Sequence, residues 1–197
     1  MTHPTLRTPH TRRVTFPEDA AALRDLPFTY SERGWTAWNT PPAGYQAVQR
    51  SGGLGTGADR FDRAAEALMR WQMHRQAGLR LITTDRVAVV GARVLLTIGV
   101  GRLAVRAPCQ VVYTVHEPTR RGFAYGTLTG HPVSGEEAFI VSLDPDTGRV
   151  TFTVRAFSRP ATPLARLGGP FTPLAQQLGI TRYLSTMAAL AQPEPRA

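Results

Sequence analysis

A closely spaced series of apolar runs between residues 79 and 157 constrains this chain more than any other feature of its sequence. The runs are short and rich in β-branched residues, and turn-forming segments such as 144–148 separate them. We expect strands at 79–83, 87–90, 94–100, 110–116, 123–128, 137–143 and 150–157. The gaps are too short for the crossover helices that parallel neighbours need. The series therefore predicts an antiparallel sheet of about six or seven strands.

A helix is expected on each side of this series. The first has an apolar face with members at helical spacing and ends at Gly78, and the face consists of Phe61, Ala64, Ala65, Leu68 and Trp71. The second begins near Pro173, and its apolar stripe consists of Ile180, Tyr183, Leu184, Met187 and Leu190. A sheet curled around the terminal helix buries the apolar faces of both. The predicted class is α+β, a curved antiparallel sheet wrapped around a long C-terminal helix.

The length of 197 residues suits one domain with short extensions. We expect an N-terminal arm at 1–27, a single domain at 28–192 and a tail at 193–197. Within the domain, residues 28–53 carry four aromatic residues in what reads as irregular chain, and we expect Tyr30, Trp35, Trp38 and Tyr45 to pack rather than to extend into solvent.

The charge of the chain leaves a nucleic-acid partner open. The formal net charge is +9, and the sequence contains no lysine, so all 23 basic residues are arginine. Excess positive charge attracts phosphate without regard to base sequence. The arginines are scattered, however, whereas a binding arm typically has a run of five or more basic residues. Nucleic-acid binding is therefore an alternative and not the favoured interpretation.

Cysteine, histidine and hydropathy patterns exclude several other classes. Cys109 is alone, so we expect no disulfide framework and a reducing, cytoplasmic location. The histidines have no His-x-x-x-His spacing, and we expect neither a metal nor a cofactor. The most apolar stretch, residues 87–105, contains Arg93 and Arg102, and the N-terminus has no apolar signal segment. We therefore expect no membrane span.

Two enzyme-like patterns are weak. Residues 53–58 fit a G-x-G-x-x-A dinucleotide pattern, but a nucleotide-binding fold needs further parallel units that the later hairpins do not supply. Ser158, His131 and Glu136 are the residue types of a hydrolase triad, yet Ser158 has no glycine-flanked elbow.

Several ordered segments resemble a known family. They are 29–34, 54–57 with Phe61, 71–75, 108–113, 122–128, 130–132, 135–137 and 156–161. Together they resemble the domain-of-unknown-function family numbered nineteen-ninety, over about residues 28–183. That family has no established activity. More loosely, the chain is similar to the helix-grip or START-like superfamily of ligand-binding and cyclase domains, a resemblance that implies a ligand cavity between sheet and C-terminal helix.

A polar group on the predicted strands is the best candidate site. Its members are Tyr113, Tyr125, His131, Glu136, Glu137 and Arg159. We expect the two tyrosines to face each other, His131 to exchange protons near neutral pH, and Arg159 to bind an anionic group. The alternative is structural: a glutamate pairs with Arg155 or Arg159, and His131 shapes its turn. Candidate walls of the cavity are Trp71 and Met73 on the first helix and Tyr183 and Met187 on the last.

These observations lead to three functional hypotheses. The first is a binding module for a small hydrophobic molecule held between the sheet and the terminal helix. The second is a cyclase- or hydrolase-type enzyme in which His131 and a glutamate transfer protons. The third is an arginine-rich protein that binds nucleic acid.

Overall fold

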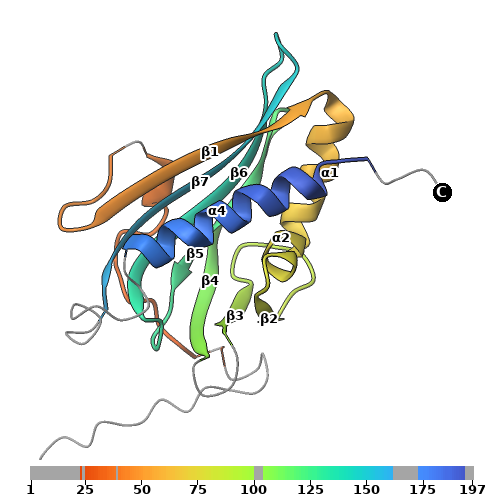
Figure 1. The fold of residues 1–197 in the computed structure, drawn as a ribbon. Helices are drawn as coiled ribbons and strands as arrows, with labels where there is room; N and C mark the ends of the chain where they lie inside the picture. Colours follow the sequence, from red (N-terminus) through yellow and green to blue (C-terminus); the bar gives the residue numbers. More distant parts are fainter. Residues whose placement is uncertain (1–22, 24, 39, 100–103, 162–172, 194–197) are drawn as a thin grey trace, which may run out of the picture.

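The computed structural model describes residues 23, 25–38, 40–99, 104–161 and 173–193, and these form one curved sheet with helices on one face (Figure 1). The strands are β1 (Gln46–Thr56), β2 (Arg80–Thr83), β3 (Arg93–Ile98), β4 (Val105–His116), β5 (Arg120–Thr127), β6 (Val133–Leu143) and β7 (Arg149–Pro160). The helices are η2 (Trp35–Ala37), α1 (Ala58–Met69), α2 (Gln72–Gln76) and α4 (Pro173–Leu190).

The strand order is β1-β7-β6-β5-β4-β3-β2, and every neighbouring pair is antiparallel. From β2 to β7 the sheet follows the chain, because each connection returns the chain beside the strand it has just left, whereas β1 pairs with the distant β7. Between β6 and β7, for example, the Asp144 carboxylate accepts hydrogen bonds from the backbone N–H groups of Asp146 and Thr147. The predicted antiparallel sheet is confirmed.

The helix α4 crosses the concave side of the sheet, with α1 and α2 beside it (Figure 1). We call this side the inner face and the opposite side the outer face. Large inner-face side chains of β5, β6 and β7, among them Phe123, Phe139 and Phe152, form the core together with residues of α1, α2 and α4. A curved sheet around a C-terminal helix is the predicted fold class, which is therefore confirmed.

The first predicted helix is broken in the structure. The helix α1 ends at Met69, and Trp71 takes a left-handed backbone conformation with φ of 63° before α2 begins. This conformation is unfavourable for a bulky side chain, but the Trp71 side chain is fully buried. Gly78 follows α2 with φ of 87°, as expected of a glycine that ends a helix.

Two other expectations on the strands are wrong. Residues 46–53, part of the segment 28–53 that was expected to be irregular, belong to the edge strand β1. Residues 87–90, expected to be a strand, form a loop in which the Ala88 N–H donates to the Met69 carbonyl at 2.8 Å instead of to a strand neighbour. The apolar character of this run does not reflect a sheet position, because Val89 and Val90 are exposed.

Residues 28–38 and 40–45 lie over the outer face, where Tyr30 and Tyr45 pack as expected, whereas the expectation is wrong for Trp38, which is 70% exposed. Tyr30 and Tyr45 both contact the Phe157 ring edge-on, at centroid distances of 5.8 and 5.0 Å. Nearly all of the expected arm at 1–27, and all but one residue of the expected tail at 193–197, lie outside the described residues. Among the helices that the structure describes, none combines the length and the hydropathy needed to cross a membrane.

Candidate functional site

The sheet separates the predicted site residues into two groups. Successive residues in a strand point to opposite faces, so Glu136 lies on the outer face and Glu137 on the inner face. The register pairs Tyr125 with Val111 and Tyr113 with Ala124, because a bulge lies between Val111 and Tyr113. The two tyrosines therefore do not face each other: Tyr113 is on the outer face and Tyr125 on the inner face.

On the outer face, Glu136 anchors the segment that precedes β1. Its carboxylate accepts hydrogen bonds from Tyr30 Oη at 2.7 Å, from the Gly34 N–H at 2.7 Å, and from both the N–H and the hydroxyl of Thr36. The Thr36 hydroxyl also lies 2.8 Å from Tyr113 Oη. Burial raises the pKa of Tyr30, as does the neighbouring Glu136, so its phenol stays a donor. These contacts give Glu136 a structural role.

His131 and Arg159 lie apart from the inner-face residues. His131 Nδ1 lies 2.9 Å from the Val133 carbonyl and 3.1 Å from the Val133 nitrogen, within the turn between β5 and β6. Burial lowers the pKa of His131 to about 4. The Arg159 guanidinium stacks 4.5 Å from the centre of the Tyr45 ring. Their predicted functional roles stay predictions, and their present contacts shape the turn and the outer face.

On the inner face, Glu137 is the central polar group. Tyr125 Oη donates to Glu137 Oε2 at 3.1 Å, and Tyr183 reaches the same region from α4. Burial raises the pKa of Glu137 to about 7, because a carboxylate is poorly solvated there. Burial likewise raises the pKa of both tyrosines. At neutral pH this carboxyl group exists in both protonation states.

His74 was not among the predicted site residues, and the structure places it at the centre of the inner-face rings. Its imidazole lies within 6.1 Å of the rings of Trp71, Phe123, Tyr125, Phe139 and Tyr183. Both of its nitrogens, and Trp71 Nε1, are buried without a hydrogen-bond partner among the described residues. Burial lowers the pKa of His74 to about 3, so the imidazole is neutral. We define Trp71, His74, Tyr125, Glu137 and Tyr183 as the inner cluster.

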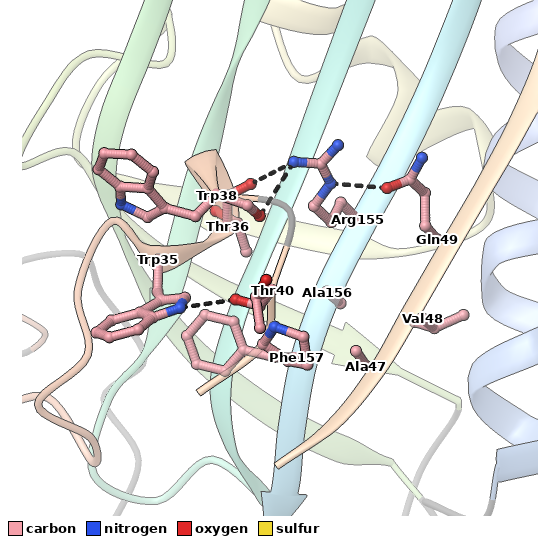
Figure 2. A pocket seen from close by; sticks show the side chains of 11 residues that line it. Trp35, Thr36, Trp38, Thr40, Ala47, Val48, Gln49, Arg155, Ala156 and Phe157 are labelled. Atoms are coloured by element: carbon pink, nitrogen blue, oxygen red, sulfur yellow. Dashed lines mark hydrogen bonds between the residues drawn. The ribbon is translucent and has the colours of Figure 1, made fainter. Parts of the chain in front are cut away.

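A separate pocket opens on the outer face, where η2 approaches β1 and β7 (Figure 2). Its volume is about 120 Å³, and Trp35 and Trp38 form one wall, with side chains that are 41% and 70% exposed. Arg155 holds the loop by donating to the carbonyls of Thr36 and Trp38, at 3.1 and 3.3 Å. This pocket was not predictable without β1, because residues of this strand form part of its lining.

Metal binding and thiol chemistry find little support in the part of the chain that the structure describes. No group of three potential metal-ligating side chains occurs there. Cys109 is buried at the inner face of β4, and burial raises the pKa of its thiol.

The architecture defines a helix-grip protein, and solved structures agree at the level of the fold. A hypothetical protein from Helicobacter pylori matches with a TM-score of 0.57 and 11% identity, over 75% of this chain and 88% of that one. Major latex-like protein 151 from Panax ginseng matches with a TM-score of 0.53 and 12% identity, over 76% and 99%. Norcoclaurine synthase from Thalictrum flavum, in complex with dopamine and hydroxybenzaldehyde, matches with a TM-score of 0.52 and 9% identity, over 76% and 90%.

The chain belongs to the family described as Domain of unknown function (DUF1990), whose sequence profile matches residues 29–186. A UPF0548 protein of Deinococcus radiodurans is 32% identical over 184 residues, which are 87% of this chain and 91% of that protein. A UPF0548 protein of Arabidopsis thaliana is 29% identical over 130 residues, covering 63% of this chain and 62% of that protein. The family resemblance seen in the sequence is thereby confirmed.

Proposed function

We propose that this chain binds a small, largely apolar molecule between the inner face of the sheet and α4, with the inner cluster as its polar contact. The observation that carries this proposal is the fully buried His74 imidazole, whose two nitrogens have no partner among the described residues. Ligand sites typically combine apolar and aromatic walls with a few polar groups, and the inner cluster has this composition.

The buried nitrogen atoms of His74 and Trp71 that lack a hydrogen-bond partner in the described part of the chain carry an energetic cost. A buried polar group without a hydrogen bond costs roughly 1–3 kcal/mol. Three such atoms in one aromatic cluster are a substantial cost for a domain whose total stability is of order 10 kcal/mol. A bound molecule with a donor and an acceptor would recover part of that free energy, because the neutral imidazole offers one of each.

In this proposal a ligand reaches the cluster from the side of Glu137 and Tyr183. Both residues keep part of their surface accessible, while Trp71 and His74 are fully buried. A ligand would therefore meet the carboxyl group and the phenol first and the imidazole deeper inside. Norcoclaurine synthase, a neighbour in fold, is bound to small aromatic molecules in its solved structure, which supports the fold as a suitable scaffold and says nothing of this ligand's identity.

A second candidate function is general acid–base catalysis. It is favoured by the contact between Tyr125 Oη and a carboxyl group whose pKa of about 7 suits proton transfer at neutral pH. In this version Glu137, rather than His131, exchanges the proton with the substrate. Glu137→Gln separates the two functions: in an enzyme it lowers conversion of the bound molecule about 100-fold or more, and in a binding protein the molecule is recovered unchanged from both forms.

Native mass spectrometry of the purified protein tests the binding proposal. We expect a mass above that of the polypeptide, which disappears in Glu137→Leu and in His74→Phe. The matched control is Gln49→Leu in the outer pocket, which we expect to retain the extra mass. Loss of the extra mass in Gln49→Leu alone would place the molecule on the outer face and contradict the proposal, as would a bare polypeptide mass after incubation with a cell extract.

A further inference from the structure

We infer that the molecule bound at the inner cluster is a cation, namely an apolar molecule with an ammonium group that pairs with Glu137. The inference rests on the proposed function and adds the chemical class of the ligand. The observation behind it is that Glu137 is an inner-face carboxyl group that accepts a hydrogen bond from a phenol and has no ion pair within the described part of the chain. The ion pairs formed by the described residues join other partners.

The groups that face Glu137 from each neighbouring element are neutral at pH 7. From β5, Tyr125 is its register partner and hydrogen-bond donor. From β4 comes Cys109, and from α4 comes Tyr183; burial raises the pKa of both. From β7 its register partner is Ala156, which has no charge. From α2, His74 is held neutral by burial. Among these neighbours an ionised Glu137 would therefore meet no charged partner, and Arg121, the inner-face arginine of β5, pairs with Asp62 instead.

A buried charge without a partner is unfavourable, and a ligand with the opposite charge removes that penalty. The rings around the carboxyl group favour the same ligand. The centroid distance is 5.2 Å from Tyr125 to Phe139 and 5.6 Å from Phe139 to Tyr183, so three aromatic rings lie together on this part of the inner face. The faces of such rings attract a cation that has lost its water. Carboxylate and rings together provide a site for an ammonium group with an apolar body.

A neutral or anionic ligand would need the opposite state of the site. It would bind to protonated Glu137, which then donates a hydrogen bond. The two possibilities differ in the direction of their pH dependence. With a pKa of about 7, the ionised fraction of Glu137 rises roughly ten-fold between about pH 6 and pH 8. The affinity of a cation should rise by a similar factor over this range, and the affinity of an anion should fall.

The test uses three probes of similar size, namely 2-phenylethylamine, 2-phenylethanol and 3-phenylpropionate, with binding measured by calorimetry. We expect the amine to bind at least about ten-fold more tightly than the alcohol, and its affinity to rise from pH 6 to pH 8. Glu137→Gln should remove this advantage, so that the ratio of the amine affinity to the alcohol affinity falls to about one. The matched control is Glu117→Gln, which removes an exposed carboxylate paired with Arg120 and should leave all three affinities unchanged.

Tighter binding of the alcohol or the carboxylate would overturn the inference, and so would an amine affinity that Glu137→Gln leaves intact. The absence of binding by all three probes would also overturn it. None of these results affects the mass-spectrometric test of the proposed function, which depends on whether any molecule is bound. If Glu137→Gln unfolds, Tyr183→Phe keeps the ring and removes the hydroxyl, and the amine should still bind it more tightly than the alcohol.

Discussion

Glu136 and Glu137 are neighbours in β6, yet their carboxyl groups have different surroundings. Glu136 accepts four hydrogen bonds from the segment that covers the outer face. Glu137 faces the interior, where Tyr125 is the donor that the structure gives it. Glu136 is thus suited to hold structure together, and Glu137 has capacity left for a ligand.

Glu136→Gln should lower the free energy of unfolding by about 2–4 kcal/mol. The amide carries no charge, and its NH₂ group faces donors where the carboxylate presented an acceptor, so at least one buried donor loses its partner. Urea denaturation measures the change. Glu117→Gln, at an exposed turn, is the control and should change stability by less than about 0.5 kcal/mol. Equal effects of the two substitutions would contradict the anchoring role of Glu136.

Glu137 should make the native protein less stable as pH rises. Burial raises its pKa from 4.5 to about 7 in the folded state. Between these values the folded protein holds a proton that the unfolded chain has lost, so the associated stability is present at low pH and is lost as pH rises through 7. Relative to Glu137→Gln, we expect the native protein to lose about 2 kcal/mol between pH 5 and pH 8, as measured by urea denaturation at both values.

Histidine titration affects both proteins in that comparison equally. Burial lowers the pKa of His74 and of His131, so their contribution to stability is lost as pH falls below about 6.5, which is the opposite direction. Taking the difference between native protein and variant therefore isolates Glu137. Parallel pH profiles for the two proteins would show that Glu137 titrates normally.

The sequence contained part of the information needed to place these residues. The alternation of a strand puts adjacent residues on opposite faces, but the predicted strand began at Glu137, and Glu136 joins it only in the longer β6 of the structure. The bulge before Tyr113 was not predictable, because a bulge adds a residue without a strong composition signal. His74 was missed because the left-handed turn at Trp71 redirects the helix that carries it.

At the scale of secondary-structure elements, β1 shows why an edge strand is difficult to predict. Most of its residues are exposed, so the apolar alternation of a half-buried strand is absent. Its glycines have a packing role: a Cβ at Gly52 would lie 3.2 Å from Leu184 Cδ2, so α4 crosses close to the strand. The hairpins from β4 to β7 were easier, because their turn residues and apolar alternation agree.

Gly126 allows close packing between β5 and Tyr30 of the segment that covers the outer face. A Cβ at this position would overlap the hydroxyl and ring of Tyr30, which donates to Glu136. We expect Gly126→Ala to cost about 2–3 kcal/mol of unfolding free energy, since the rigid ring must move and its hydrogen bond breaks. Gly53→Ala is the control, because a Cβ there meets nothing within 4 Å.

A double-mutant cycle extends this prediction. Gly126→Ala and Glu136→Gln disturb the same contact, so their combined cost should fall short of the sum by about 1 kcal/mol or more. Strict additivity in denaturation experiments would mean that Tyr30 does not link the two positions.

At the scale of the whole molecule, the sheet separates two differently covered surfaces. Helices cover the inner face, and residues 28–45 cover part of the outer face (Figure 1). The short gaps between strands predicted the antiparallel order, and the apolar stripe after Pro173 predicted the closing helix. The division of the candidate site between the faces did not follow, since it requires the register of every strand.

The excess of arginine should produce only weak nucleic-acid binding. Exposed arginines occur on β1, directly after α1, on α2 and on β2, for example Arg50, Arg70, Arg75 and Arg80, rather than on one element. We therefore expect fluorescence anisotropy with a short DNA duplex to show binding at low salt that is lost by about 0.15 M, as for non-specific phosphate contacts. Submicromolar affinity that persists at that salt concentration would favour the nucleic-acid hypothesis instead.

NMR of ¹³C-methyl methionine during titration with 2-phenylethylamine tests directly whether the amine binds between the sheet and α4. Met73 and Met187 are fully buried in the core beside the inner cluster and serve as reporters, and Met69 on α1 is an internal reference. We expect the methyl signals of Met73 and Met187 to shift saturably, and we expect Glu137→Gln to abolish these shifts. Unshifted signals at both residues while calorimetry shows saturation would contradict this binding site, because the molecule would then be bound elsewhere.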